Sequence, residues 1–360
     1  LSAKHQVLAE LCDIIESFLG AKEYSYFLEK LIPMFIDLLT EVPISFYNST
    51  YEHKIRSSIL EIIQRLVLND TFDQYKTIML DTITTALRSE NEENGVLCIK
   101  IITSIHKSYK NNLFDKVEEF IEIIYEIYSN SPQMVQQWFN ENATEDASST
   151  SHNPSSSPTE IGESEDFNSI PSDDDSKQEL LHSLHSFKTL SECPITMVSL
   201  LSYYKQLVNK VLLDFIPRII ALLQLEVDIQ RKERLEAEAK GNKYTSVSKR
   251  IKNRSLYGDF IISQVKATSF LAYIFIRDYS PEFFANFHDV IPDLVVRLLQ
   301  DCPSELAAAK KELLHATRHI LSTPYKTIFI PKLDLFFDES ILLGDGLTCR
   351  ETLRPLAYST

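Results

Sequence analysis

Histidine pairs are the residues of this 360-residue chain whose type and spacing come closest to a metal site. His315 and His319 stand four residues apart, which allows two imidazoles on one helix face to bind zinc. The zincin motif also needs a Glu directly after the first His, and this chain has Ala316 there. His182 and His185 are three residues apart, and neither pair has a third ligand nearby. We interpret all four as ordinary core or surface histidines and predict no metal site.

Cysteine spacing gives no nucleophile, zinc site or redox motif. The five cysteines are far apart and form no C-x-x-C pair: Cys12, Cys98, Cys193, Cys302 and Cys349. An odd and scattered set is typical of reduced, structural thiols in an intracellular protein.

The glycine turn Gly344–Gly346 does not match a phosphate-binding loop, because such a loop follows a strand and ends in Gly-Lys-Ser/Thr. Thr348 and Glu351 instead fit a capping box that opens a helix. The chain also lacks a G-x-S-x-G nucleophile elbow. We therefore predict that the segment is not an enzyme and uses no cofactor or small-molecule substrate.

Helical periodicity organises the chain. Only 7 of the 360 residues are Gly, which suits helices and argues against a protein of many tight β-turns. Apolar residues recur at steps of three and four, and no strand pattern is found. The sequence predicts an all-α protein with amphipathic stretches at about 3–19, 23–40, 51–68, 71–88, 95–109, 113–129, 195–239, 256–277, 282–300, 304–321, 325–337 and 348–360.

A recurring Ile-Pro phrase indicates how these helices are arranged. Ile-Pro followed by an apolar helical turn occurs at Pro33, Pro217, Pro292 and Pro331. The last two prolines are 39 residues apart, and Pro217 precedes Pro292 by 75. A period near 40 with two helices per unit is typical of HEAT or armadillo repeats. Since each pair can cover its apolar stripe only with the next pair, we predict a HEAT-type solenoid.

Two segments interrupt the pattern. Residues 141–178 carry ten acids and one base and few large apolar groups, so we predict an acidic, Ser-rich disordered insertion between repeats at 1–140 and 179–360. Ser157 and Ser172 are hypothetical phosphorylation sites within it. The stretch 231–254 begins as a charged helix and ends as a basic loop with five cationic residues: Lys243, Lys249, Arg250, Lys252 and Arg254. This loop is either a partner contact or an ordinary solvated connection.

Net charge and hydropathy argue against nucleic acids and membranes as partners. The net charge is −15, of which −9 comes from 141–178, so direct nucleic-acid binding is disfavoured. The most apolar run, 211–223, contains Asp214 and Arg218, so no membrane span is predicted. The first residue is not Met and the last residues continue a predicted helix, so we expect the chain to be a piece of a longer protein.

The C-terminal third resembles the TRRAP family, the transformation/transcription domain-associated proteins. The resemblance rests on IKNRSLYGDFIISQVKATSFLAY (251–273), ELLHATRHIL (312–321) and FIPKLDLFFDESILLGDGLTCRETLRPLAYST (329–360). It departs at positions such as Phe337 before Asp338, is diffuse over 1–140 and is absent from 141–178. The Asn-, Ile- and Ser-rich composition indicates a yeast member.

The resemblance implies a nuclear, non-catalytic scaffold. Such proteins are large pseudokinases shared by the SAGA and NuA-four histone acetyltransferase complexes, and transcription activators contact their HEAT solenoid. It therefore implies activators and other complex subunits as partners. Because activator segments are usually acidic and apolar, the basic loop at 243–254 is our candidate contact, and the resemblance itself marks no contact residues. Two alternatives stay open: the HEAT region of an active phosphatidylinositol-3-kinase-like protein kinase, and an importin-like transport receptor.

Overall fold

The computed structural model describes residues 1–18, 24–68, 70–110, 113–139, 180–277, 286–343 and 353–354. Within these ranges every regular element is a helix, and β-type pairing is limited to two isolated bridges, Tyr47 with Leu180 and Asn91 with Ser183. The predicted all-α class is confirmed.

The N-terminal part consists of α1 (Ser2–Phe18), α2 (Tyr24–Glu41), α3 (Tyr51–Leu66), the 3-10 helix η1 (Asp70–Tyr75), α4 (Lys76–Leu87), α5 (Glu92–Tyr109), α6 (Phe114–Ser129) and α7 (Ser131–Phe139). After residue 180 follow α8 (Phe187–Tyr203), η4 (Lys205–Leu207), α9 (Val208–Gln224), α10 (Asp228–Ala239), η5 (Ser248–Arg250), α11 (Arg254–Ile276), α12 (Ile291–Asp301) and α13 (Ala307–Leu321). The described part closes with η7 (Pro324–Lys332), α14 (Leu333–Phe336) and α15 (Glu339–Leu343).

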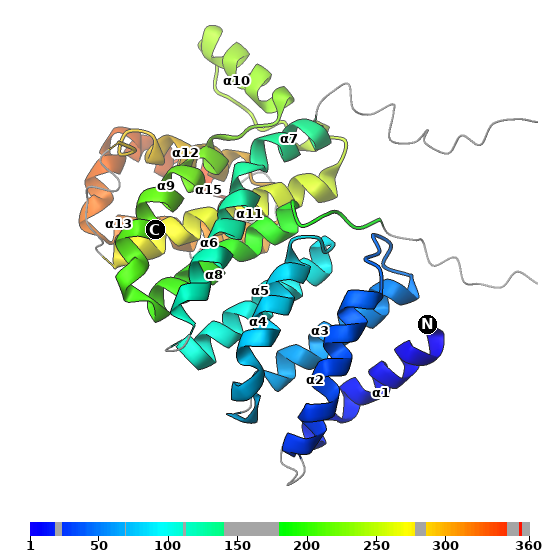
Figure 1. Cartoon of the computed structure of the whole chain (residues 1–360). Helices are drawn as coiled ribbons and strands as arrows, with labels where there is room; N and C mark the ends of the chain where they lie inside the picture. The colour runs from blue at the N-terminus through cyan, green and yellow to red at the C-terminus, as the bar shows by residue number, and fades with distance from the viewer. Residues whose placement is uncertain are drawn as a thin grey trace, which may run out of the picture.

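Two layers of helices form the array (Figure 1). The first layer, which we call the inner layer, is the succession α1, α3, α5, α8, α11 and α13, in which each helix packs along the next. The second layer, which we call the outer layer, contains α2, α4, α6, α9 and α12, whose mutual contacts are sparser. Each helix of the second layer is followed in the chain by its partner in the first. This is the stacked-pair arrangement of a solenoid, and it runs from α1 at one end to α13 at the other (Figure 1).

Three of the four Ile-Pro phrases occupy equivalent places. Pro33 and Pro217 lie inside α2 and α9, and Pro292 lies in the first turn of α12, so all three mark helices of the same layer. The prediction of a fourth such α-helix over 325–337 was wrong, because Pro331 lies in the 3-10 helix η7. Pro324 and Pro331 each lack an amide donor, so the regular hydrogen bonds of an α-helix cannot all form in this segment.

Several helix boundaries also differ from the sequence pattern. The stretch 195–239 is not one helix but parts of α8, α9 and α10, because the chain turns at Tyr204 and again after Gln224. Helix α12 begins at Ile291, with a turn over 286–290 instead of the predicted helix. The short helix α7 was not predicted, since its nine residues bury only one side. The predicted insertion 141–178 and the helix over 348–360 lie outside the described residues, apart from Leu353 and Arg354.

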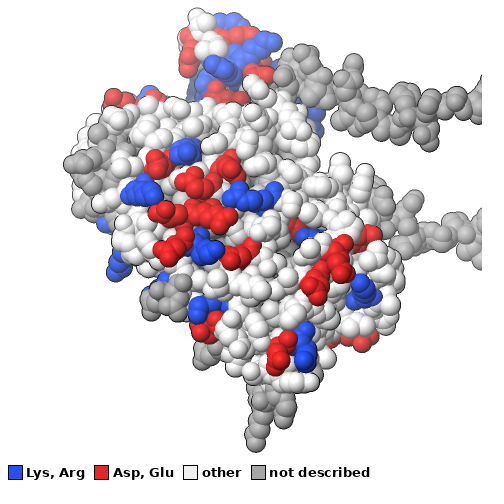
Figure 2. Space-filling model, viewed as in Figure 1, with Lys and Arg blue, Asp and Glu red and all other residues white. Residues whose placement is uncertain are grey.

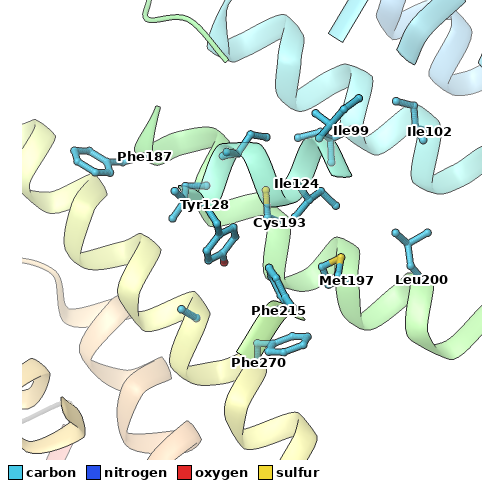
Figure 3. Packing of buried hydrophobic residues seen from close by; sticks show 14 of the residues in the cluster. Ile99, Ile102, Ile124, Tyr128, Phe187, Cys193, Met197, Leu200, Phe215 and Phe270 are labelled. Carbon is cyan, nitrogen blue, oxygen red and sulfur yellow. The ribbon is translucent and has the colours of Figure 1, made fainter. Parts of the chain in front are cut away.

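The core lies between the two layers and is continuous along the array. Around α8 it joins four neighbouring helices, with Ile99 and Ile102 from α5, Ile124 and Tyr128 from α6, Phe215 from α9 and Phe270 from α11 (Figure 3). Phe215 contacts Tyr128 and Phe270 edge-on, with ring centroids 4.8 and 5.1 Å apart. Each helix pair thus completes its core with side chains of its neighbours.

Helix α11 is long and apolar enough to cross a membrane by length and composition. It is also largely buried, because α8 packs on one side of it, α13 on the other and α9 against its inner face. Its apolar character is that of a central core helix, surrounded by protein on most sides.

Buried donors cap the ends of three outer-layer helices. Arg56 of α3 donates from Nη1 to the carbonyls of Leu39 and Val42 at the end of α2, at 2.6 and 2.7 Å. Gln264 of α11 donates to Leu222 and Leu225 at the end of α9, both at 3.0 Å. Lys310 of α13 donates to Leu299 near the end of α12. The last carbonyls of a helix have no partner inside it, so one side chain of the following helix satisfies them.

Candidate protein-docking surfaces

The described part of the chain contains no group of three or more His, Cys, Asp and Glu side chains that could hold a metal ion. His315 is half-buried and His319 is exposed on α13. His182 contacts the Trp138 ring, with ring centroids 4.2 Å apart and the planes tilted by 46°, and His185 contacts the side chain of Asn130. Cys12, Cys98, Cys193 and Cys302 are buried thiols that form no disulfide among the described residues. Burial raises the pKa of the Cys98 and Cys193 thiols, which opposes formation of a nucleophilic thiolate.

Other positions singled out in the sequence lie outside the described residues: Ser157, Ser172, Gly344, Gly346, Thr348, Cys349 and Glu351.

Helix α10 and the loop after it project from the end of the outer layer (Figure 1). Arg234 anchors this hairpin by donating to Glu226, at 2.9 Å, and to Asp301 at the end of α12, at 2.8 Å. Tyr244 donates to the same Asp301 carboxylate and lies under the Arg234 guanidinium, 4.0 Å from ring centroid to guanidinium carbon. The chain then turns back through η5 into α11. The contacts of Arg234 and Tyr244 with Asp301 hold α10 and the loop after it at a fixed place.

The five predicted contact residues do not all offer free positive charge. Lys243 pairs with Asp338, Arg250 with Glu233 and Arg254 with Glu305. Hydrogen bonds from Lys243 and Ser340 lower the pKa of Asp338 to about 2. In the described ranges only Lys249 and Lys252 of the five have no ion-pair partner, and both are exposed. Sequence composition could not reveal this neutralisation, because two of the three acids lie 51 and 95 residues away.

A cleft lies beside the same loop and has a volume of about 360 Å³. Lys243 and Lys249 line one wall, and residues after α12, including Ser304 and Glu305, line the other. Ser248 also lines the cleft and is 8% exposed. The cleft offers ammonium and hydroxyl donors, which suits a carboxylate-bearing segment.

An acidic surface covers α6, on the face seen in Figure 2. Its members are exposed and follow one side of that helix: Asp115, Glu118, Glu119, Glu122 and Glu126. Basic residues of adjacent helices surround it, with Lys210 2.8 Å from Glu118 and Arg88 3.6 Å from Glu119. These pairs are exposed and each contributes little to stability.

Comparison with known proteins identifies the family. The family described as "Tra1 HEAT repeat central region" matches residues 256–360, from α11 to the end of the chain. The Saccharomyces cerevisiae protein named "SAGA complex/NuA4 acetyltransferase complex subunit TRA1" is 46% identical over 100% of this chain, which corresponds to 10% of that protein. The human "Transformation/transcription domain-associated protein" is 33% identical over 99% of this chain and 9% of its own length.

The chain belongs to the Tra1/TRRAP family.

The Schizosaccharomyces pombe relative, also named a SAGA complex/NuA4 acetyltransferase complex subunit, is 29% identical over 99% of this chain and 10% of its own length. The chain thus spans about a tenth of the length of the curated Tra1/TRRAP proteins it matches. The sequence similarity to these relatives covers the whole chain, whereas the phrases that carry the resemblance in the sequence lie in its C-terminal third. The HEAT description of the matching family agrees with the stacked helix pairs of the structure.

Proposed function

We propose that this chain is a non-catalytic scaffold segment of a nuclear transcription coactivator subunit of the SAGA and NuA4 type. The observation that supports this most strongly is the 46% identity, over the full chain, to a yeast protein named as a subunit of both complexes. The architecture fits, because a solenoid presents a long surface and carries no catalytic cleft at the centre of a domain. In this role the segment contacts other complex subunits and the acidic, apolar segments of transcription activators.

The basic loop over 243–254 is the proposed contact for activators. Lys249 and Lys252 are exposed and unpaired within the described ranges, and Lys249 lines the 360 Å³ cleft. A carboxylate entering the cleft meets Lys249 and the nearby serine hydroxyls. Charge-assisted hydrogen bonds of this kind are about twice as strong as neutral ones.

A binding measurement tests the activator contact. A fluorescein-labelled peptide of Leu and Glu at helical spacing is titrated with the chain and followed by anisotropy. The double variant Lys249→Ser/Lys252→Ser is expected to weaken binding about tenfold, and binding is expected to fall with added salt. The matched control is Lys116→Ser/Lys210→Ser, which removes the same charge from the α6–α9 face. Equal affinities for the two double variants would remove the loop from the proposal.

Complex membership is tested separately. The full-length protein that contains this segment is purified from its own cells with a C-terminal affinity tag. Acetyltransferase subunits of both complexes are expected to co-purify, and the isolated complexes are expected to acetylate histones. Purification with neither complex would overturn the proposed function, whatever the peptide measurement shows.

A further inference from the structure

A second cleft lies on the inner layer, where α8 is flanked by α5 and α11. It has a volume of about 350 Å³ and is lined by residues of all three helices. Four apolar side chains form much of its lining: Val96 and Leu97 from α5, Phe187 from α8 and Ile262 from α11. Three of the four are half-buried, so apolar surface remains accessible within the cleft. A partner that covers this surface gains free energy in proportion to the apolar area removed from water.

Carboxylates surround the apolar lining. Glu92 and Glu93 lie at the start of α5, Glu192 lies on α8 and Asp259 on α11, and one lysine, Lys188, is among them. Lys188 Nζ lies 3.5 Å from Glu92. Lys100 reaches Glu192 only at 3.9 Å, which is a weak pairing. The cleft is therefore net acidic around an apolar centre, the opposite charge of the cleft at 243–254.

Asp259 is the carboxylate with the least compensation. It is half-buried, and within the described ranges no hydrogen bond or ion pair satisfies it. Burial raises its pKa, and the charge of Glu92 raises it further, while Lys188 and His182 lower it. A cation placed in the cleft would restore to this carboxylate part of the solvation lost on folding.

The apolar strip continues beyond the cleft. Ile195 lies one helical turn after Ser191 on α8 and is 59% exposed. Together with Leu97 and Ile262 it offers contacts for residues spaced three or four apart on a bound helix. From Phe187 to Ile195 this surface follows α8 for about two helical turns.

We propose that this cleft, lined by α5, α8 and α11, binds a short protein segment that combines apolar anchors with Lys or Arg. The apolar side chains enter between α5 and α11, and the cationic side chains pair with Asp259, Glu192 and Glu93. The acidic rim repels phosphate-bearing ligands such as nucleic acids and anionic lipids. This partner differs in charge from the activator segments proposed above, so the two sites select different segments.

The direct test uses two labelled peptides of fourteen residues, one of Leu and Lys with Leu at helical spacing and one with Glu in place of Lys. The Lys peptide is expected to bind the chain, and the triple variant Glu93→Gln/Glu192→Gln/Asp259→Asn is expected to weaken it at least tenfold. The matched control is Glu118→Gln/Glu122→Gln/Glu126→Gln, which removes the same charge from α6 and is expected to change affinity less than twofold. Thermal melting checks that both variants are folded.

Two further measurements distinguish the outcomes. A peptide with Ser replacing Leu is expected to lose binding, because charge alone does not fill the apolar lining. Hydrogen exchange is expected to show protection at the first turns of α5 and α8 when the Lys peptide is bound. Equal losses in the two triple variants, or undiminished binding of the Ser peptide, would show general charge attraction and overturn the inference. Binding of the Glu peptide tests the 243–254 loop, and binding of the Lys peptide tests the acidic cleft. The two proposals can therefore fail separately.

Discussion

Arg56 and Glu90 form a buried ion pair on which two helix ends depend. Their side chains are 3% and 0% exposed, and Arg56 Nε donates to Glu90 at 2.7 Å. The same guanidinium caps the carbonyls of Leu39 and Val42. Removing it leaves the two carbonyls without this donor, and it leaves the buried carboxylate without a positive charge, with the side-chain amide of Asn94 donating at 3.3 Å. The pair holds the end of α2 against the start of α5.

We expect Arg56→Leu to lower the free energy of unfolding by about 3–5 kcal/mol, because the remaining charge is buried and unpaired. Urea denaturation followed by circular dichroism measures this. The control Arg88→Leu removes an exposed arginine that pairs with Glu119 and Glu126, and it is expected to change stability by less than about 1 kcal/mol. A loss below 1 kcal/mol for Arg56→Leu would contradict the assigned role.

His106 makes stability depend on pH. It is fully buried, its Nδ1 lies 2.8 Å from the Tyr204 hydroxyl, and burial lowers its pKa from 6.5 to about 4. The unfolded chain therefore binds a proton below pH 6.5 that the folded chain takes up only near pH 4. The contribution of neutral His106 to the free energy of unfolding is fully present above pH 6.5. It is lost as the pH falls toward 4, and the loss amounts to about 3 kcal/mol.

The contribution of His106 to this pH dependence is measured as the difference between the natural chain and the variant His106→Leu. Burial also lowers the pKa of His53 and His185, so they act in the same direction, and Glu93 and Glu126 oppose them. We expect His106→Leu to flatten the decline in unfolding free energy between pH 6.5 and 4.5 while the remaining slope persists. Parallel curves for the variant and the natural chain would show that folding does not change the pKa of His106.

At the scale of elements, α10 is held largely by polar contacts. Gln230 is its one buried residue, whereas α11 beside it buries most of its length. The contacts of Arg234 with Glu226 and Asp301 therefore carry much of its attachment. Hydrogen exchange of α10 is expected to proceed by local opening, and that of α11 by larger unfolding.

We expect Arg234→Met to speed amide exchange in α10 about tenfold, because two charge-assisted contacts are lost. Exchange in α11 is expected to change less than twofold. The control Lys240→Met breaks the exposed pair with Glu236 on the same helix and leaves exchange nearly unchanged. Faster exchange in α11 as well would mean that the hairpin and the core open together.

At the scale of the whole molecule, the helices of each described pair make their main contacts within the pair and with the neighbouring pairs. Ile62 lies buried in α3 and Leu313 in α13, at opposite ends of the array. Each change to Ala is expected to cost about 2–5 kcal/mol, from lost burial and a residual cavity. Stability in such an array is a sum of local terms, so damage at one end should stay there.

We therefore expect Ile62→Ala and Leu313→Ala to add within about 0.5 kcal/mol in the double variant. Hydrogen exchange is expected to rise near α3 for the first change and near α13 for the second. The adjacent pair Phe215→Leu and Phe270→Leu, whose rings touch, serves as the coupled comparison. Strong coupling between the distant sites would show one cooperative unit in place of separate repeats.

Sequence alone determined the helical class, the repeat and most helix positions, because the spacing of apolar residues and the Ile-Pro phrases are local properties of the chain. It did not determine that η7 is a 3-10 helix or that α9 and α10 are separate. Those features depend on how each segment packs against its neighbours in the folded chain.

Tertiary structure alone decided which charges remain available. Lys243, Arg250 and Arg254 are neutralised by acids that stacking brings beside them, and Arg56, Gln264 and Lys310 are buried because each faces the end of an adjacent helix. The acidic cleft unites residues of α5, α8 and α11 that are separated by as many as 170 positions. Electrostatic and packing contacts act through space, so their partners are fixed only when the helix pairs stack.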